Sequence, residues 1–166
     1  MKWLLTILTL ISFSLFGQTC LPSIAETAAQ LSFVDKGDGT VSDPVRGLTW
    51  MRCSLGQTWV NQSCEGDASE LNWQQALQAA HGLLYANKLG WRVPNIKELS
   101  SITERSCVRP AINEILFPNT PSDDFWTSTP SVQDPSRAWV IAFFNSSNSL
   151  KQKNLFVFTR LVRTAD

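Results

Sequence analysis

Four cysteines and one histidine limit the chemistry that this chain can carry out. The cysteines are Cys20, Cys53, Cys64 and Cys107, and the histidine is His81. A histidine-based zinc site would have one ligand, and a serine, histidine and aspartate triad could use only His81. We therefore interpret His81 as a surface residue on the flank of a helix. An even set of cysteines is typical of disulfides formed in an oxidising compartment.

Loop lengths favour one of the three pairings that four cysteines allow. Cys53 and Cys64 enclose only a short polar loop, so we expect a local bridge between them. The second bridge would then join Cys20 to Cys107 and tie an N-terminal segment, residues 18–30, to the body of the domain. Because this bridge closes a long loop, its predicted entropic stabilisation is larger, about 4 kcal/mol.

Closely spaced aspartates near the N-terminus could bind calcium, but a β-hairpin explains them better. Asp35, Asp38 and Asp43 surround Gly37 and Gly39. An EF-hand loop needs an oxygen-bearing side chain in place of Gly37 and a glutamate at its twelfth position, and the sequence has neither. Asp-Gly between β-forming residues is a strong hairpin signal. We expect a hairpin, with calcium binding by Asp35 and Asp38 as the weaker alternative and no other cofactor.

A set of late polar and aromatic residues offers the chemistry of sugar recognition. The C–H faces of sugars stack on tryptophan rings, and carboxylates and amides bind sugar hydroxyls. The candidate ligand-binding residues are Asp123, Asp124, Trp126, Asn145 and Asn148. A strand would point the adjacent Asp123 and Asp124 in opposite directions, so they form no acid–base pair. The alternative is that Trp126 belongs to the core and the polar residues line turns.

The first residues have the pattern of a secretory signal peptide. Lys2 precedes an apolar run from Trp3 to Phe16, which is too short to be a membrane span. We expect a signal peptide over residues 1–17, because cleavage after Gly17 keeps all four cysteines, whereas the alternative site after Ala25 would leave three. The mature chain would be exported to the periplasm, the outer-membrane surface or the medium. Its single net negative charge argues against non-specific nucleic-acid binding.

Two amphipathic stretches predict helices with matching N-terminal caps. Asn72 followed by Gln75, and Asn95 followed by Glu98, both fit the capping box. The apolar faces are Trp73, Ala76, Leu77, Ala80 and Leu84 in the first helix, and Ile96, Leu99 and Ile102 in the second.

The stretch Trp91-Arg92-Val93-Pro94-Asn95 leads into the second helix and is best explained as scaffold. Pro94 holds the residue before it in an extended conformation. Trp91 can bury its ring where the chain turns into the helix, and Arg92 can bind nearby carbonyl groups or a carboxylate.

The rest of the chain favours strands and ordered loops. Residues 53–67 are predicted as a polar loop, and strands are expected over 125–130, 137–144 and 154–163, with a turn over 145–149. The predicted fold is therefore α+β, with two helices packed on a small antiparallel sheet, long ordered loops and two disulfides.

Several phrases occur in an order that identifies a family. They are FVDKGDGTVSDPVRGLTWMRCSLGQTW, WQQAL, WRVPNIKELSSI, CVRPAINEILFPNTPS, FWTSTP and TRLVR. Together they resemble the Lcl C-terminal domain family, a bacterial exported group, over roughly Cys20 to Arg163. The resemblance implies one domain over residues 31–166 with a C-type-lectin-like fold, related to that of the formylglycine-generating enzyme. The structural signature consists of Trp50, Trp73, Trp91, Arg92, Pro94, Asn95, Glu98 and Arg163.

The resemblance implies an exported, lectin-like binding module that recognises a glycan or a protein on a surface, in an adhesion-type role and without catalysis. The best-understood relatives end collagen-like adhesins, trimerise and bind sulfated glycosaminoglycans. This chain has neither a Gly-x-y stalk nor a dense basic surface, so neither property is expected of it, and its oligomeric state stays open. The alternatives are an assembly subunit of a bacterial surface appendage and, less favoured, a formylglycine-generating type of enzyme, whose chemistry needs reactive cysteines.

Overall fold

The computed structural model describes residues 17–28 and 32–166 of the 166-residue chain. The predicted signal peptide therefore lies outside the described residues, except for Gly17. Within the described ranges, no helix is long and apolar enough to cross a membrane.

A four-stranded antiparallel sheet joins strands from both ends of the domain. In the order β11-β4-β3-β2, its strands are Val162–Thr164, Leu48–Met51, Thr40–Asp43 and Val34–Asp35. The turn between β2 and β3 contains Gly37 and Gly39, both with positive φ, so the predicted hairpin is confirmed. Because alternate residues of a strand point to opposite faces, one face presents Val41, Trp50 and Val162, which are fully buried in the core.

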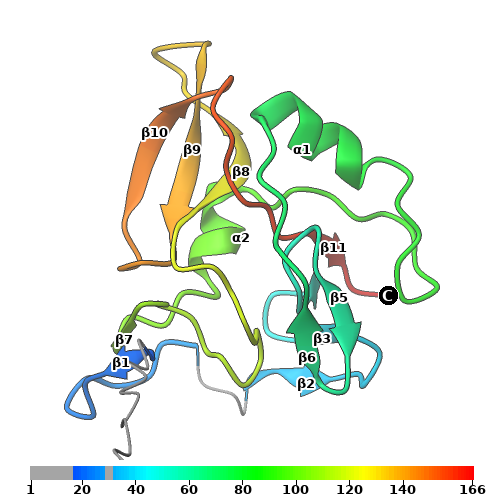
Figure 1. The fold of residues 1–166 in the computed structure, drawn as a ribbon, viewed down its shortest axis with the longest axis vertical. Helices are drawn as coiled ribbons and strands as arrows, with labels where there is room; N and C mark the ends of the chain where they lie inside the picture. The colour runs from blue at the N-terminus through cyan, green and yellow to red at the C-terminus, as the bar shows by residue number, and fades with distance from the viewer. Residues whose placement is uncertain (1–16, 29–31) are drawn as a thin grey trace, which may run out of the picture.

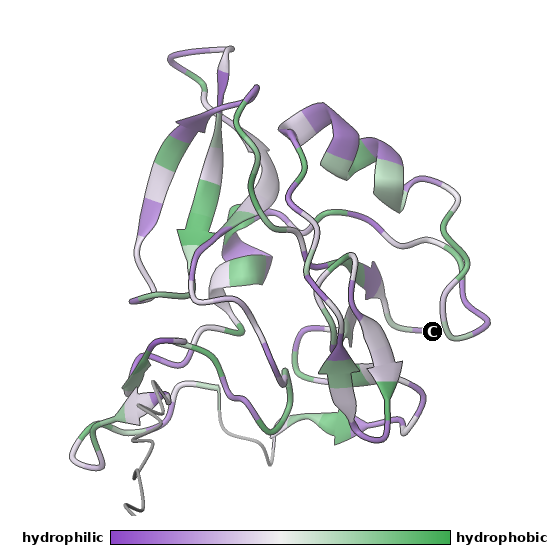
Figure 2. Cartoon of the chain, viewed as in Figure 1, coloured by the Kyte–Doolittle hydropathy of each residue, from purple (hydrophilic) through white to green (hydrophobic). Residues whose placement is uncertain are grey.

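A second antiparallel sheet contains the late strands, in the order β10-β9-β8. The strands are β8 (Asp124–Pro130), β9 (Arg137–Ala142) and β10 (Asn148–Gln152). The predicted strands near 125–130 and 137–144, and the turn that follows them, are confirmed. The central strand β9 is more hydrophobic than the edge strand β10 (Figure 2), because core side chains cover both of its faces.

The two predicted helices and both capping boxes are confirmed. The helices are α1 (Trp73–Ala80), capped by Asn72, and α2 (Ile96–Ser100), capped by Asn95. Figure 1 shows α1 beside β8 and α2 below the same strand. The predicted stripe of α1 is too long by one residue: the helix ends before Gly82, whose φ of 70° is left-handed, and Leu84 is 65% exposed.

Two small antiparallel strand pairs complete the β-structure. Strands β5 (Thr58–Val60) and β6 (Ser63–Glu65) pair with each other, and β1 (Thr19–Cys20) pairs with β7 (Cys107–Val108). The prediction of a plain loop over residues 53–67 is therefore wrong. Its turn residues Asn61 and Gln62 have φ of 48° and 63°, the positive values that tight hairpin turns require. The usual sequence for such a turn is Asn-Gly, so Asn-Gln gave a weaker signal.

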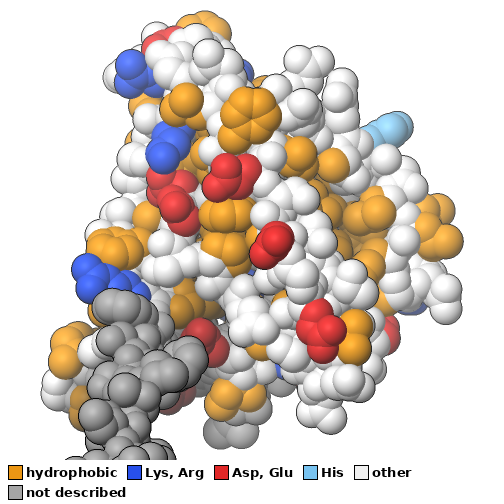
Figure 3. Space-filling model, viewed as in Figure 1, with side chains coloured by type: hydrophobic (Ala, Val, Ile, Leu, Met, Phe, Trp, Pro, Cys, Tyr) orange, Lys and Arg blue, Asp and Glu red, His pale blue; other side chains and the backbone are white. Residues whose placement is uncertain are grey.

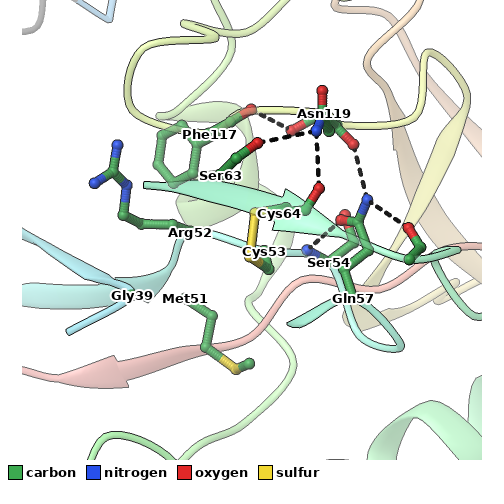
Figure 4. Close-up of a disulfide and its surroundings, with 12 residues drawn as sticks. Gly39, Met51, Arg52, Cys53, Ser54, Gln57, Ser63, Cys64, Phe117 and Asn119 are labelled. Atoms are coloured by element: carbon green, nitrogen blue, oxygen red, sulfur yellow. Dashed lines mark hydrogen bonds between the residues drawn. A yellow bond between two sulfur atoms is a disulfide. The ribbon is translucent and has the colours of Figure 1, made fainter. Parts of the chain in front are cut away.

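The cysteines form Cys20–Cys107 and Cys53–Cys64, the pairs that the loop lengths favoured. The first bridge joins the paired strands β1 and β7 and so attaches the N-terminal segment, here residues 17–28. The second lies under the β5–β6 hairpin, where Asn119 donates hydrogen bonds to Ser63 Oγ and the Cys64 carbonyl (Figure 4).

A buried carboxylate provides a second attachment for the N-terminal segment. Glu104 accepts hydrogen bonds from the backbone N–H groups of Thr27, Ala28 and Ser106, and from the Ser106 hydroxyl. Burial opposes ionisation of Glu104, but these hydrogen bonds outweigh it, so the pKa of its carboxyl is lowered.

The predicted fold class is wrong. The described residues form four sheets with eleven strands, and the two helices contain only eight and five residues. The protein is therefore mostly β, rather than two helices packed on one small sheet. Segments predicted as ordered loops contain short strands, and a two- or three-residue strand has too few alternating positions to show a period.

The predicted closing strand over residues 154–163 is also only partly correct. Regular pairing is confined to β11, and Leu155 and Phe156 are exposed. The chain then runs through the core from Val157 to Val162. Its backbone bonds go to several elements in turn, with carbonyls accepting from Trp126, Leu55 and Met51, because it passes between the two larger sheets instead of beside one strand.

The core consists of two clusters separated by this segment. One contains Val41, Trp50, Leu99, Phe117, Phe125 and Ile141, and lies between the four-stranded sheet, α2 and β8–β9. The other contains Ala76, Trp91, Trp126, Val140 and Leu161 and is covered by α1.

Candidate functional site

A groove of about 680 Å³ lies over the face of the four-stranded sheet that points away from the core. Val34, Ser42, Thr49 and Arg163 form its floor and one wall, and they occupy one row across all four strands. These residues alternate with Val41, Trp50 and Val162 on the buried face. We call this feature the sheet groove.

Hydroxyl groups line the floor of the sheet groove. Ser42 and Thr49 face each other across β3 and β4, with their hydroxyl oxygens 3.4 Å apart. Thr40 lies beside them, and its hydroxyl donates to Asp38 Oδ1 at 2.6 Å. A hydroxyl can donate and accept at once, so this floor offers several hydrogen bonds to a polar ligand.

Cationic side chains form one wall of the sheet groove. Lys88 Nζ and Arg163 Nη2 both donate to the carboxylate of Asp166, at 2.6 and 2.7 Å. The hydrogen bonds from Arg163 and Lys88 hold the pKa of the Asp166 carboxyl well below its usual range. Arg163 is fixed further, because its Nε donates to the Leu89 carbonyl and only 14% of its side chain is exposed.

The Trp-Arg-x-Pro-Asn stretch positions the far wall of the groove. Trp91 lines the groove, but it is 4% exposed and its indole N–H donates to the Lys88 carbonyl at 3.0 Å, so it gives the wall its shape rather than a stacking surface. The backbone of Arg92 pairs with Val162 of β11, and its guanidinium binds both oxygens of Glu98 at 2.7 and 2.8 Å.

The remaining signature residues have structural contacts as well. Trp50 is fully buried, the Trp73 indole donates to the Thr127 carbonyl, and the Pro94 carbonyl accepts from Ser128. The hydrogen bond from Arg92 lowers the pKa of the Glu98 carboxyl, and Glu98 also closes the capping box on Asn95.

The structure brings only some of the sequence-predicted ligand residues together. Asp123, Asp124 and Asn145 line a depression of about 330 Å³ beside the turn between β9 and β10. Asp124 is paired with Lys151 at 2.5 Å. Asn148 begins β10 opposite Ile141 and does not line this depression.

Trp126 lies in the core. It is fully buried, and its indole N–H donates to the Leu71 carbonyl at 2.8 Å, so its ring is not available to a sugar. The depression keeps one aromatic wall, Phe144, whose ring is covered by the Arg109 guanidinium at 4.7 Å. The depression is also smaller than the sheet groove.

The two aspartates of the calcium alternative have protein partners. Asp35 Oδ2 binds Arg52 at 2.6 Å, and Asp38 Oδ1 accepts from the Thr40 backbone and hydroxyl. Across residues 17–28 and 32–166, no group of three or more His, Cys, Asp or Glu side chains could hold a metal ion.

Basic side chains form no dense patch on the face drawn in Figure 3, where they lie along one edge and acidic side chains are spread between them. The cations of the sheet groove were missed from the sequence, because Lys36, Lys88 and Arg163 are far apart along the chain. The available signal was the alternation of Thr40, Val41 and Ser42, which places hydroxyls on one face of a strand.

Comparison with known proteins agrees with the sequence resemblance. The model of one family, the Lcl C-terminal domain, matches residues 39–163. This range contains β3, β4, both helices and most of β11, and thus much of the sheet groove. No curated protein matches the chain. Because the family match covers well over half of its residues, the chain belongs to the Lcl C-terminal domain family.

Proposed function

We propose that this protein is an exported, non-enzymatic binding module that recognises a glycan in the sheet groove. The observation that carries the proposal is a concave surface outside the core, in which the hydroxyls of Ser42 and Thr49 and the guanidinium of Arg163 lie in one cross-strand row. Concave sites with a few convergent polar groups are the usual places for small ligands. The hydroxyls of Ser42 and Thr49 can bond to sugar hydroxyls, and the long side chains of Lys88 and Arg163 can reach over a bound ring.

Export and the absence of catalysis are parts of the same proposal. Two disulfides and the family are consistent with an exported protein. All four cysteines are paired, so none offers the thiol on which formylglycine-generating chemistry depends. The groove contains hydroxyls and cations beside Asp38 and Asp166, whose carboxylates are engaged by neighbouring residues.

The proposal is tested by binding of the oxidised protein to a glycan array, followed by titration of each positive oligosaccharide. The double variant Ser42→Ala/Thr49→Val keeps the shape of the floor and removes two hydroxyls. Each lost hydrogen bond is worth about 1 kcal/mol, so we expect affinity to fall by about 10- to 30-fold.

The matched control is Thr58→Val/Ser149→Ala, which removes two exposed hydroxyls from β5 and β10. It should bind like the unchanged protein. Equal affinity of both double variants would show that the sugar binds elsewhere, and an array without any hit would contradict the glycan proposal itself.

An assembly role is the second candidate, and one observation favours it. The N-terminal segment and the loop after β7 expose apolar side chains around a separate depression of about 610 Å³, among them Leu21, Ile24 and Ile115. Exposed apolar patches often mark protein contacts. Substituting Ile115 with glutamate should abolish a crosslinked complex in the assembly case and leave glycan affinity unchanged in the lectin case.

A further inference from the structure

We propose that the sheet groove takes a carboxylate-bearing saccharide, and that the Asp166 side chain occupies the place of the ligand carboxylate until the ligand arrives. This inference rests on the proposed glycan-binding function and adds the chemical class of the ligand and a means of regulating access. It follows from the contacts of one residue, Asp166, with the cationic wall.

The Asp166 carboxylate contacts the cationic wall in the way that a ligand carboxylate would. Its Oδ1 accepts from Arg163 and its Oδ2 from Lys88, so two cations from different segments converge on a single carboxylate. Charge-assisted hydrogen bonds of this kind are shorter and stronger than those between neutral groups. The two donors are thus already arranged for a carboxylate.

Among residues 17–28 and 32–166, the side-chain contacts of this carboxylate are those to Lys88 and Arg163. Asp166 keeps 61% of its side chain exposed, whereas Arg163 is held at 14% by its bond to the Leu89 carbonyl. The acid is therefore the more exposed partner, and the arginine is the more enclosed one. When a ligand carboxylate displaces the Asp166 side chain, Arg163 therefore stays in position to bind it.

The charge of the groove favours that exchange. Lys36, Lys88 and Arg163 line it, against Asp38 and Asp166. The Asp38 carboxylate is bonded to the Thr40 backbone and hydroxyl. When the Asp166 side chain leaves the groove, three cations remain beside one carboxylate, that of Asp38, which is already hydrogen-bonded to Thr40. The groove then attracts an anion.

The hydroxyl floor selects a saccharide among carboxylates. Arg163, Thr49 and Ser42 lie in the same cross-strand row, so a ligand whose carboxylate meets Arg163 extends its neighbouring groups over the two hydroxyls. A uronic acid has this pattern, because its ring places hydroxyls next to the carboxylate. A fatty acid or an aromatic acid would leave the floor unbonded.

The experiment measures calorimetric binding of tri-galacturonate, its methyl ester and a sulfated trisaccharide to the full oxidised protein and to Asp166→Asn. A self-occupied site lowers apparent affinity by the fraction of molecules in which it is free. We therefore expect Asp166→Asn to bind tri-galacturonate about tenfold more tightly, and Arg163→Gln to lose binding. The matched controls are Asp134→Asn and Arg137→Gln, which alter an exposed ion pair outside the groove.

Each outcome decides one part of the proposal. Equal affinity of the unchanged protein and Asp166→Asn would overturn self-occupation. An ester that binds as tightly as the acid, or an equal gain for the sulfated trisaccharide, would overturn the carboxylate assignment while the glycan proposal stands. If none of the three ligands binds the unchanged protein or Asp166→Asn, but neutral sugars on the array do bind, only this inference fails. If neither protein binds any glycan on the array, the proposed function fails as well.

Discussion

Replacing the buried Arg160 with methionine should destabilise the protein by about 2–4 kcal/mol. Arg160 is fully buried, and no carboxylate in the described part of the chain pairs with it. Its Nη1 donates to the carbonyls of Met51 and Arg52, and its Nη2 to Thr120 Oγ1 at 2.7 Å. Burial lowers its pKa to about 9, so the guanidinium stays charged at pH 7.

The expected magnitude comes from two opposing terms. Methionine keeps the aliphatic stem but loses the cation–π contact with Phe117, whose ring lies 4.8 Å from the guanidinium. The substitution leaves the buried carbonyls of Met51 and Arg52 without this donor, which costs about 1–3 kcal/mol for each carbonyl. The hydroxyl of Thr120 can rotate to another partner. Removing the buried charge returns several kcal/mol of desolvation. We expect the lost bonds to win, because Arg160 donates at once to the carbonyls of residues 51–52 and to Thr120.

The assay is urea denaturation of the oxidised protein at pH 7, with Arg137→Met as the control. Arg137 is exposed and forms one surface ion pair, so its loss should cost less than about 1 kcal/mol. Arg160→Lys retains the charge but not the forked donor, and it should be nearly as unstable as Arg160→Met. A methionine variant as stable as the unchanged protein would refute this account, because burial of the charge would then outweigh its hydrogen bonds.

Three further predictions concern the scaffold. Glu98→Gln should lower the free energy of unfolding by about 1 kcal/mol at pH 7. Because the folded-state pKa of Glu98 is lowered, its stabilisation is present above the unfolded pKa and is lost as the pH falls through the folded pKa. If the variant's deficit in urea midpoint were equally large at about pH 3, the ion-pair explanation would be contradicted. Gly39→Ala should lower the free energy of unfolding by more than about 2 kcal/mol, because its Cβ would meet the Tyr85 hydroxyl. At Gly37 the space is open, so Gly37→Ala should cost about 1 kcal/mol. Similar decreases in melting temperature for both variants would exclude the clash. Glu104→Gln should speed amide hydrogen exchange in the N-terminal segment by about tenfold, and unchanged protection there would show that the disulfide and the β1–β7 pair hold the segment without Glu104.

The parts of the fold that were predictable from the sequence depend on neighbouring residues. The capping boxes at Asn72 and Asn95 use side chains three positions apart, and the β2–β3 turn uses glycines that lie inside it. The bridge between Cys53 and Cys64 spans a separation of 11 residues. In each case the physical cause and its consequence lie within one short segment, so the pattern is visible without knowing what packs around it.

The parts that were missed depend on what lies across space. A closing strand was predicted over residues 154–163, yet the segment passes between two sheets and both Thr159 and Arg160 are fully buried. A polar side chain in an alternating pattern is normally assigned to solvent. Burial of this arginine depends on its hydrogen bonds to Thr120 and to the carbonyls of Met51 and Arg52, more than a hundred residues earlier.

The same alternation explains why a family signature can be clear while the ligand is not. On β4, Trp50 points to the core and Thr49 to the sheet groove, so a change of ligand at Thr49 need not disturb the packing of Trp50. Other signature residues serve the scaffold through contacts within the protein, as Asn95 and Glu98 do in capping α2 and Arg92 does in binding Glu98. Arg163 is different, because one of its nitrogens fixes the Leu89 carbonyl and another faces the groove. Its position is thus set by the fold and its charge is available to a ligand, which makes it the residue through which the scaffold and the proposed recognition are coupled.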